Sequence, residues 1–283
     1  MLIKIKNKTF DSLDSLLDSR YGTDVVVALV GDNAAHQFRQ TSLSMEEIEV
    51  TMPFTCVDTR YTEQELQNII RAIKDSHMLL CPSDTLFVLS ELETEKDLDN
   101  CLKFSEQLKS YNLSFLVTHE KNRHKVEFPN IASKFKHTIF VTDDTVNLFY
   151  PVKHLICDYY RPSCVGIDVA DVFYVFMTEC KMTSYFLRKT FPHMDAMKDY
   201  VPELLADIDA KIKVEHSYPN FMFFIEVSQS MALDEIDNFT SSVIDKYADY
   251  DTNIVWSFNF NREESDDTCT LLLQTVFPSQ ENE

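Results

Sequence analysis

The sequence predicts an α/β protein in which a domain with a mostly parallel sheet is followed by a smaller α/β domain. Strand-like and helix-like segments alternate through the first half of the chain, which is typical of βαβ units. After Arg161-Pro162 a second series of helices and strands begins. With 283 residues, of which 45% are hydrophobic, the chain is large enough to bury a sizeable core.

The first half begins with its clearest strand. Val25–Val30 is a continuous apolar run rich in β-branched residues, as in strands that are buried on both faces. It ends at Gly31-Asp32-Asn33, and a helix-like stretch follows. Further strands are expected over Phe54–Val57, His77–Cys81, Leu113–Val117 and Thr138–Val141, and helices over Glu63–Ile73 and Leu102–Leu108. Because parallel strands are joined by right-handed crossovers, these helices are expected on both faces of the sheet.

The second half carries its own sheet. The strongest strand signal is Phe221–Val227, a nearly unbroken run of large apolar residues. The other strands are expected over Ile254–Phe260 and Thr270–Phe277, and the helices over Val172–Met177, Leu204–Ile212 and Ile236–Tyr247. This half therefore reads as a smaller α/β unit.

Composition excludes several classes of function. The formal net charge of −20 repels phosphate backbones and anionic lipids, so neither nucleic acid nor direct membrane contact is expected. No run approaches the roughly 20 apolar residues of a membrane-spanning helix, and the first residues do not resemble a signal peptide. Seven cysteines without a C-x-x-C pair fit reduced, buried thiols. A cytoplasmic location is expected.

Glycine is informative because it is scarce. Only Gly22, Gly31 and Gly166 are present. Loops that wrap phosphate groups need glycine, since their backbone must approach the ligand closely and often adopts positive φ. The sequence therefore predicts no glycine-rich phosphate loop and no nucleotide cofactor, and GTPase activity is not expected. Since no metal-ligand motif is recognisable, no metal is expected either, and no catalytic residue is assigned.

Three motifs of the second half resemble the bacterial tubulin-type division protein FtsZ. Residues 161–172 (RPSCVGIDVADV) are similar to the family's Arg-Pro-Gly followed by Asn-x-Asp-Phe-Ala-Asp-Val. Residues 204–209 (LLADID) are similar to its Leu-Leu-Glu-Asp-Ile-Asp step. Residues 233–236 (LDEI), with the helix and strand that follow, are similar to its Leu-x-Glu helix. Their common order over residues 161–277 makes the resemblance fairly specific for this half.

The resemblance implies a tubulin/FtsZ-like fold in which a central helix joins a Rossmann-like domain to the smaller domain. The expected ranges are residues 1–144, a degenerate nucleotide-binding-type domain, residues 145–162, the central helix, and residues 163–283, the C-terminal domain. In the first of these ranges the family's nucleotide loops match in position only. Their vestiges are Gly31, Asp32 and Asn33 after the first strand, and Ser83 and Asp84 in the tubulin signature region.

Asp168 and Asp171 are the strongest site candidates. In FtsZ filaments the equivalent carboxylates of one subunit enter the nucleotide pocket of its neighbour, so the resemblance implies an inter-subunit loop. Gly166 stands where the family has asparagine. A structural interpretation remains beside this one: Asp168 could cap the following helix, with Asp171 at its third position, where carboxylates bind free amides. The two interpretations are compatible.

The remaining candidates have simpler interpretations. Gly31-Asp32-Asn33 is favoured as a turn that caps the next helix over a vestigial phosphate loop. Leu86, Phe87 and Leu89 are expected in the signature loop, where they either fill the volume of the missing guanine or form an exposed apolar contact for a partner. His119, His124 and His137 are expected at the surface and show no metal-ligand motif.

The leading functional hypothesis is a nucleotide-independent, FtsZ-like protein that modulates or caps FtsZ-type filaments in cell division. A filament subunit needs two complementary ends, and this chain retains the motif of one of them. Its expected partner is FtsZ or another FtsZ-like subunit, including a second copy of itself. Two alternatives remain: a cytoskeletal scaffold that self-assembles without nucleotide, and an enzyme with a rebuilt nucleotide pocket.

Overall fold

The computed structural model describes residues 3–5, 8–10, 25–37, 54–58, 64, 85–107, 113–157, 175–176, 181–228, 231, 233–248, 250, 252–260 and 267–278. The chain divides into two compact units, Met1–Tyr160 and Arg161–Glu283. Each unit is described by itself.

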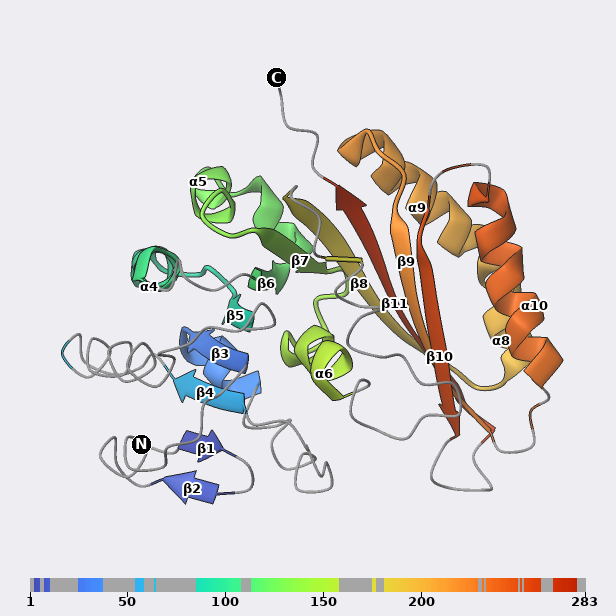
Figure 1. Ribbon diagram of the computed structural model, residues 1–283, viewed down its shortest axis with the longest axis horizontal. Helices are drawn as coiled ribbons and strands as arrows, with labels where there is room; N and C mark the ends of the chain where they lie inside the picture. Colours follow the sequence, from blue (N-terminus) through green and yellow to red (C-terminus); the bar gives the residue numbers. More distant parts are fainter. Residues whose placement is uncertain are drawn as a thin grey trace. The chain divides into compact units, whose positions relative to one another are not determined.

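The first unit contains a sheet of parallel strands (Figure 1). In spatial order these are β4 (Phe54–Asp58), β3 (Val25–Val30), β5 (Thr85–Ser90), β6 (Leu113–His119) and β7 (His137–Val141). Large apolar side chains of neighbouring strands pack together, and the rings of Phe87 and Phe115 stack at 4.8 Å. Because all these strands run the same way, their carboxyl ends meet at one edge, which we call the carboxyl edge.

Short helices follow the strands of this unit. They are α4 (Glu95–Gln107), the 3-10 turn η1 (Glu120–His124), α5 (Phe128–Ala132) and α6 (Phe149–Cys157). Residues 32–37 form a further helical segment directly after β3. A small antiparallel hairpin of β1 (Ile3–Ile5) and β2 (Lys8–Phe10) precedes the sheet.

The second unit is a mixed sheet with helices. Its strands lie in the order β8 (Met182–Phe191), β11 (Cys269–Pro278), β9 (Asn220–Val227) and β10 (Ile254–Phe260). Strand β11 is antiparallel to both neighbours, whereas β10 is parallel to β9. The helices are α8 (Met194–Asp199), α9 (Val201–Glu215) and α10 (Leu233–Ile244), with the 3-10 turn η2 (Asp245–Tyr247).

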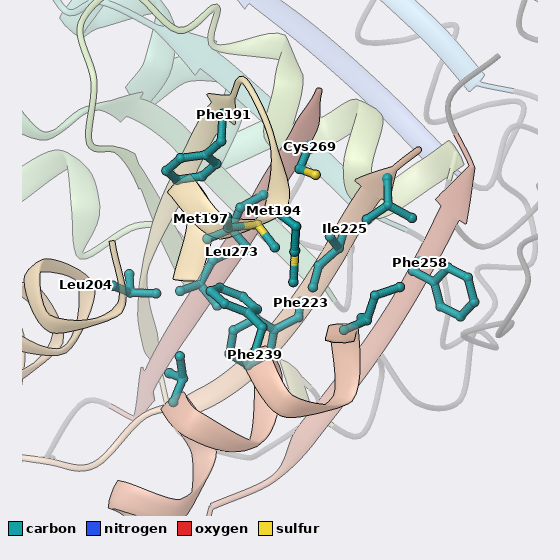
Figure 2. Packing of buried hydrophobic residues seen from close by; sticks show 14 of the residues in the cluster. Phe191, Met194, Met197, Leu204, Phe223, Ile225, Phe239, Phe258, Cys269 and Leu273 are labelled. Atoms are coloured by element: carbon teal, nitrogen blue, oxygen red, sulfur yellow. The ribbon is translucent and has the colours of Figure 1, made fainter. Parts of the chain in front are cut away.

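The core of this unit lies between sheet and helices (Figure 2). Phe223 and Ile225 of β9 and Leu273 of β11 face Phe239 of α10 and Met197 of α8, and all five are at most 2% exposed. Alternate residues of each strand contribute to this cluster, because successive side chains of a strand point to opposite faces.

The alternating α/β architecture predicted from the sequence is confirmed, and most expected strands are found within a residue or two of their predicted bounds. Two differences stand out. Leu86–Leu89, expected in a loop, form the middle of β5. Strand β8 was not predicted, because Arg188 and Lys189 interrupt its apolar pattern. The predicted strand His77–Cys81 and all of the predicted helix Glu63–Ile73 except Gln64 lie outside the described residues.

Candidate functional site

The carboxyl edge of the parallel sheet gathers a set of buried polar groups. Glu91 follows β5, His119 is the last residue of β6, and Gln37 is the last described residue of the helical segment after β3. The segment Val146–Leu148, between β7 and α6, completes the set. These groups come from four strand ends that are far apart in sequence. We call them the carboxyl-edge network.

The centre of the network is an ion pair between Glu91 and His119. Nδ1 of His119 lies 2.8 Å from the Glu91 carboxylate, and Nε2 lies 2.8 Å from the carbonyl oxygen of Val146. Both partners are acceptors when Glu91 is ionised, so both ring nitrogens must carry a proton. The geometry therefore assigns an imidazolium to His119. The two residues are only 1% and 7% exposed, so water does not screen this pair strongly.

The electrostatic environment supports these charge states. Burial opposes ionisation of Glu91, but the hydrogen bond and charge of His119, together with the Gln37 amide, outweigh it and hold the pKa of Glu91 below its ordinary value of 4.5. Burial likewise opposes protonation of His119. The bond to Glu91, the charge of Glu91 and the Val146 carbonyl outweigh that burial and raise the pKa of His119 above 6.5.

Gln37 ties the network to the neighbouring strand ends. Its Nε2 donates to Glu91 at 2.9 Å, and its Oε1 accepts from the Leu148 amide at 2.9 Å. Its backbone carbonyl accepts from Nδ2 of Asn147 at 2.7 Å. Asn147 Oδ1 in turn accepts from the Phe149 amide, the first residue of α6. One glutamine therefore connects the segments that follow β3, β5 and β7.

Gly31, at the end of β3, lies against the side-chain carboxylate of Asp97. It has φ +92, and a Cβ built on it would lie 2.9 Å from Oδ1 of Asp97. Asp97 is held there by a reciprocal cap at the start of α4: its Oδ2 accepts from the Thr94 amide at 3.0 Å, and its own amide donates to Oγ1 of Thr94 at 3.2 Å. Glycine is required here by both backbone conformation and close approach.

The loop between β5 and α4 is held in an unusual conformation. Leu92 has φ 51, a left-handed conformation that is uncommon for a branched apolar residue. Its carbonyl oxygen accepts from Nζ of Lys125 at 2.5 Å, and its amide donates to Oγ of Ser90 at 3.0 Å. Glu93 accepts from Nδ2 of Asn33 at 2.6 Å, which ties the loop to the helical segment after Gly31.

The arrangement is suited to holding the edge together and poorly suited to acid–base chemistry. Glu91 and His119 are buried, and their polar side-chain atoms form hydrogen bonds with other groups of the protein. Neither residue therefore offers these atoms to a substrate. The acids Asp97 and Glu93 lie close to the start of the segment after β3, at Gly31 and Asn33, where a phosphate would need positive or neutral donors. Within the described ranges, no three His, Cys, Asp or Glu side chains converge on a metal site.

The structure places some of the predicted site residues and not others. Gly31, Asp32 and Asn33 begin the helical segment after β3, and Asp32 and Asn33 are exposed. The vestigial positions Ser83 and Asp84 lie outside the described residues. The inter-subunit loop of Gly166, Asp168 and Asp171 lies outside them as well, so its role stays a prediction.

Two expectations are wrong. Leu86, Phe87 and Leu89 are at most 3% exposed, so they form no exposed apolar contact, and they lie in strand β5 and not in a loop. That they fill the volume of the missing guanine stays a prediction. The loop that follows β5 is Glu91–Thr94. His119 and His137 are not surface residues, since they are 1% and 2% exposed at a strand end and a strand start. His124 is exposed, as expected.

The sequence did not point to Gln37, Glu91 or Asp97, and its pattern placed His119 wrongly at the surface. One signal was available: Thr94-x-x-Asp97 before a helical pattern is a capping motif. Placing β5 correctly would also have put Glu91 directly after a buried parallel strand, the usual position of site residues in such sheets. No local pattern links Glu91 to His119, because their contact depends on the sheet.

Comparison with protein-family models and with curated proteins finds no match. Solved structures do match over nearly the whole chain. An FtsZ mutant from M. jannaschii has a TM-score of 0.57 and 14% identity, covering 94% of this chain and 93% of its own. CetZ from Methanosaeta thermophila has 0.56 and 11%, covering 90% and 87%. TubZ from Bacillus thuringiensis, described as GDP-form protofilaments, has 0.55 and 8%, covering 95% and 90%.

This similarity establishes the fold. The FtsZ/tubulin-like architecture expected from the motifs at residues 161–172, 204–209 and 233–236 is confirmed over both units. The low identity accords with a divergent sequence. No helix among the described residues is long and apolar enough to cross a membrane.

Proposed function

We propose that this chain, which has the FtsZ/tubulin-like fold, works by protein–protein association without binding a nucleotide. In this proposal it modulates or caps FtsZ-type filaments in cell division. Proteins of the same fold include TubZ, described as GDP-form protofilaments, and CetZ2 from Haloferax volcanii, described as a GTPγS-bound protofilament. In this proposal the chain keeps a surface through which filament subunits associate, but it binds no nucleotide.

The observation that carries the proposal is the contact of Asp97 with Gly31. A phosphate bound after β3 would approach the backbone at this glycine, since the start of the following helical segment offers free amides. The Asp97 carboxylate already lies there, fixed by its cap with Thr94. To admit a polyphosphate, the chain would have to break that cap and bring like charges together.

Two further features support nucleotide independence. The loop Glu91–Thr94, which follows the strand next to β3, contains two glutamates and no glycine. The Glu91–His119 pair and Gln37 connect the strand ends by themselves, so no ligand is needed to hold them. A site that depended on a ligand for order would be expected to leave some of its buried polar groups without protein partners.

The capping part of the proposal rests on Asp168 and Asp171. A subunit that offers only this carboxylate loop would dock on the nucleotide face of a filament end and block further growth, because its own opposite end lacks the nucleotide. Both proteins are expected to be acidic, but charges further apart than a Debye length of about 8 Å are screened at cellular salt.

The test is sedimentation and GTP turnover of purified FtsZ with and without this protein. We expect less pelleted FtsZ and slower turnover, and weaker effects with Asp168→Ala and Asp171→Ala. Exposed Asp99→Ala on α4 serves as a matched control that removes one carboxylate elsewhere and should act like the wild type. An unchanged pellet and turnover with the wild type would refute capping. Filaments formed by this chain alone in nucleotide-free buffer would replace capping by self-assembly.

A further inference from the structure

β10 is the outermost strand in the sheet of the second unit (Figure 1). β10 pairs with β9 over all seven residues Ile254–Phe260, in one unbroken parallel register without a bulge. Among the described residues, no strand pairs with its other side. Such an edge presents a row of backbone donors and acceptors that can template another strand.

Hydrogen bonds at the start of β10 show which residues face this edge. Asn253 donates its amide to Oδ1 of Asn220 at 2.8 Å, and its carbonyl accepts from the Phe221 amide at 2.8 Å. Both groups of residue 253 therefore point toward β9. In a parallel ladder each residue directs its amide and carbonyl to the same side, and the side alternates along the strand. Ile254, Trp256 and Phe258 consequently direct their backbone groups outward.

The edge lacks the features that usually prevent strand addition. Ile254–Phe260 contains no charged residue, no proline and no glycine, although the chain has a net charge of −20. Natural edge strands are normally protected by lysine, proline, bulges or inward charges. Phe260 is the exception at one end, since its amide donates to Oδ1 of its neighbour Asn259 at 3.0 Å and is not available.

Two of the outward residues, Ile254 and Trp256, also carry side chains that a partner would cover. Phe258 is 2% exposed within the core cluster (Figure 2), and Ile254 and Trp256 pack against that cluster while remaining partly exposed. The rings of Trp256 and Phe258 stack with their centroids 6.3 Å apart, so the partly exposed Trp256 ring packs on the buried Phe258 ring. Aromatic cross-strand pairs are among the more favourable contacts between neighbouring strands.

We propose that the β10 edge pairs antiparallel with the β10 edge of a second copy of this chain. The occupant is argued from register. Centred on Trp256, a two-fold pairing places Trp256 opposite Trp256 of the second copy and Ile254 opposite its Phe258. The outward residues Ile254, Trp256 and Phe258 of one copy then lie opposite outward residues of the other copy. Each opposite pair forms two backbone hydrogen bonds. A shift of two residues toward the carboxyl end would require the Phe260 amide, which is already engaged.

Charge and symmetry favour a second copy over other partners. Two chains with net charge −20 repel each other, so contact is easiest where neither contributes a carboxylate, and β10 is such a segment. The same surface on both copies makes the contact isologous, so it closes as a dimer and does not extend into a fibre. A contact of two strands lies at the small end of interface sizes, so we expect a dissociation constant on the order of micromolar.

Sedimentation over a concentration series, read together with tryptophan fluorescence, tests this dimer. Trp256 is the only tryptophan of the chain, so its emission reports the contact directly. We expect the mass to rise from monomer to dimer and the emission to shift to shorter wavelength over the same range. Ile254→Pro removes an outward amide without breaking a bond to β9 and should abolish both changes. Ile254→Ala keeps that amide and should retain them.

Amide hydrogen exchange of the wild type tests the dimer without relying on a variant, which could fail to fold. At high concentration the outward amides of Ile254, Trp256 and Phe258 should be protected, and on dilution they should exchange at least tenfold faster. The amides of Val255 and Ser257, which face β9, should stay protected throughout. A monomer at all concentrations, or outward amides that exchange equally fast at both, would overturn the dimer. Either result leaves the FtsZ sedimentation test unaffected, so the two proposals can fail separately.

Discussion

Replacing Glu91 perturbs the carboxyl-edge network at its centre. In Glu91→Ala, Nδ1 of His119 and Nε2 of Gln37 both lose their acceptor inside the protein. Gln37 is only partly buried, so most of the cost arises at His119, because removing one partner of a buried ion pair costs about 3–5 kcal/mol. We therefore expect Glu91→Ala to lower the free energy of unfolding by about 3–5 kcal/mol at pH 6.

Glu91→Gln is the matched variant. Neutral His119 can keep its Nε2 proton on Val146 and accept at Nδ1 from the new amide, while the amide oxygen still accepts from Gln37. Every buried group then keeps a partner and only the charge is lost, so the expected cost is about 1–2 kcal/mol. Urea unfolding at pH 6 measures both variants. Losses below about 1 kcal/mol for Glu91→Ala would refute the buried pair.

The remaining predictions concern pH, backbone, capping and thiol reactivity. The stability advantage of the wild type over Glu91→Gln should be full between about pH 4.5 and 6.5, since the depressed pKa of Glu91 removes it only at lower pH and the raised pKa of His119 only at higher pH. Unfolding titrations across pH 3–9 (a range set by those groups) should show this window, and a flat difference would contradict it. Gly31→Ala should cost about 1–3 kcal/mol in urea unfolding because of positive φ and contact with Asp97, and an unchanged midpoint would count against that contact. Thr94→Ala should cost about 1 kcal/mol, whereas Thr94→Ser keeps the cap and should cost less; equal midpoints would argue against the cap. Burial raises the pKa of Cys101 to about 12, so iodoacetamide should label it only after unfolding, as peptide mapping would show; rapid labelling of the folded chain would contradict its burial.

The fold was predictable where strands are apolar throughout. Val25–Val30 matches β3 because a buried strand shows as an unbroken run of β-branched and other apolar residues. Strand β8 was missed because its charged residues lie on partly exposed positions. Strand β5 was misread because the resemblance placed a signature loop on its residues, although Thr85–Ser90 has the composition of a buried strand.

The candidate site was predictable only in part. Gly31 was identified as the end of β3, and a helical segment follows it, although Asp32 and Asn33 lie within that segment and their role as a cap stays a prediction. Its close contact with Asp97 was not predictable, since it joins residues far apart in sequence through the sheet. The same holds for Glu91 and His119: neither position shows a motif, and only the parallel order of β5 and β6 brings them together. The local sequence pattern therefore predicted helices and strands, whereas the contacts between residues far apart in sequence depended on the order of strands in the sheet.

Titration of the purified chain with GTP and GDP, in the presence of Mg²⁺, tests the central claim most directly. Calorimetry and thermal unfolding in the same buffer give two independent readouts of binding. The acidic carboxyl edge predicts no saturable heat and no change in melting temperature with either nucleotide. Saturable binding with a raised melting temperature would contradict nucleotide independence, because any ligand of the folded state must stabilise it.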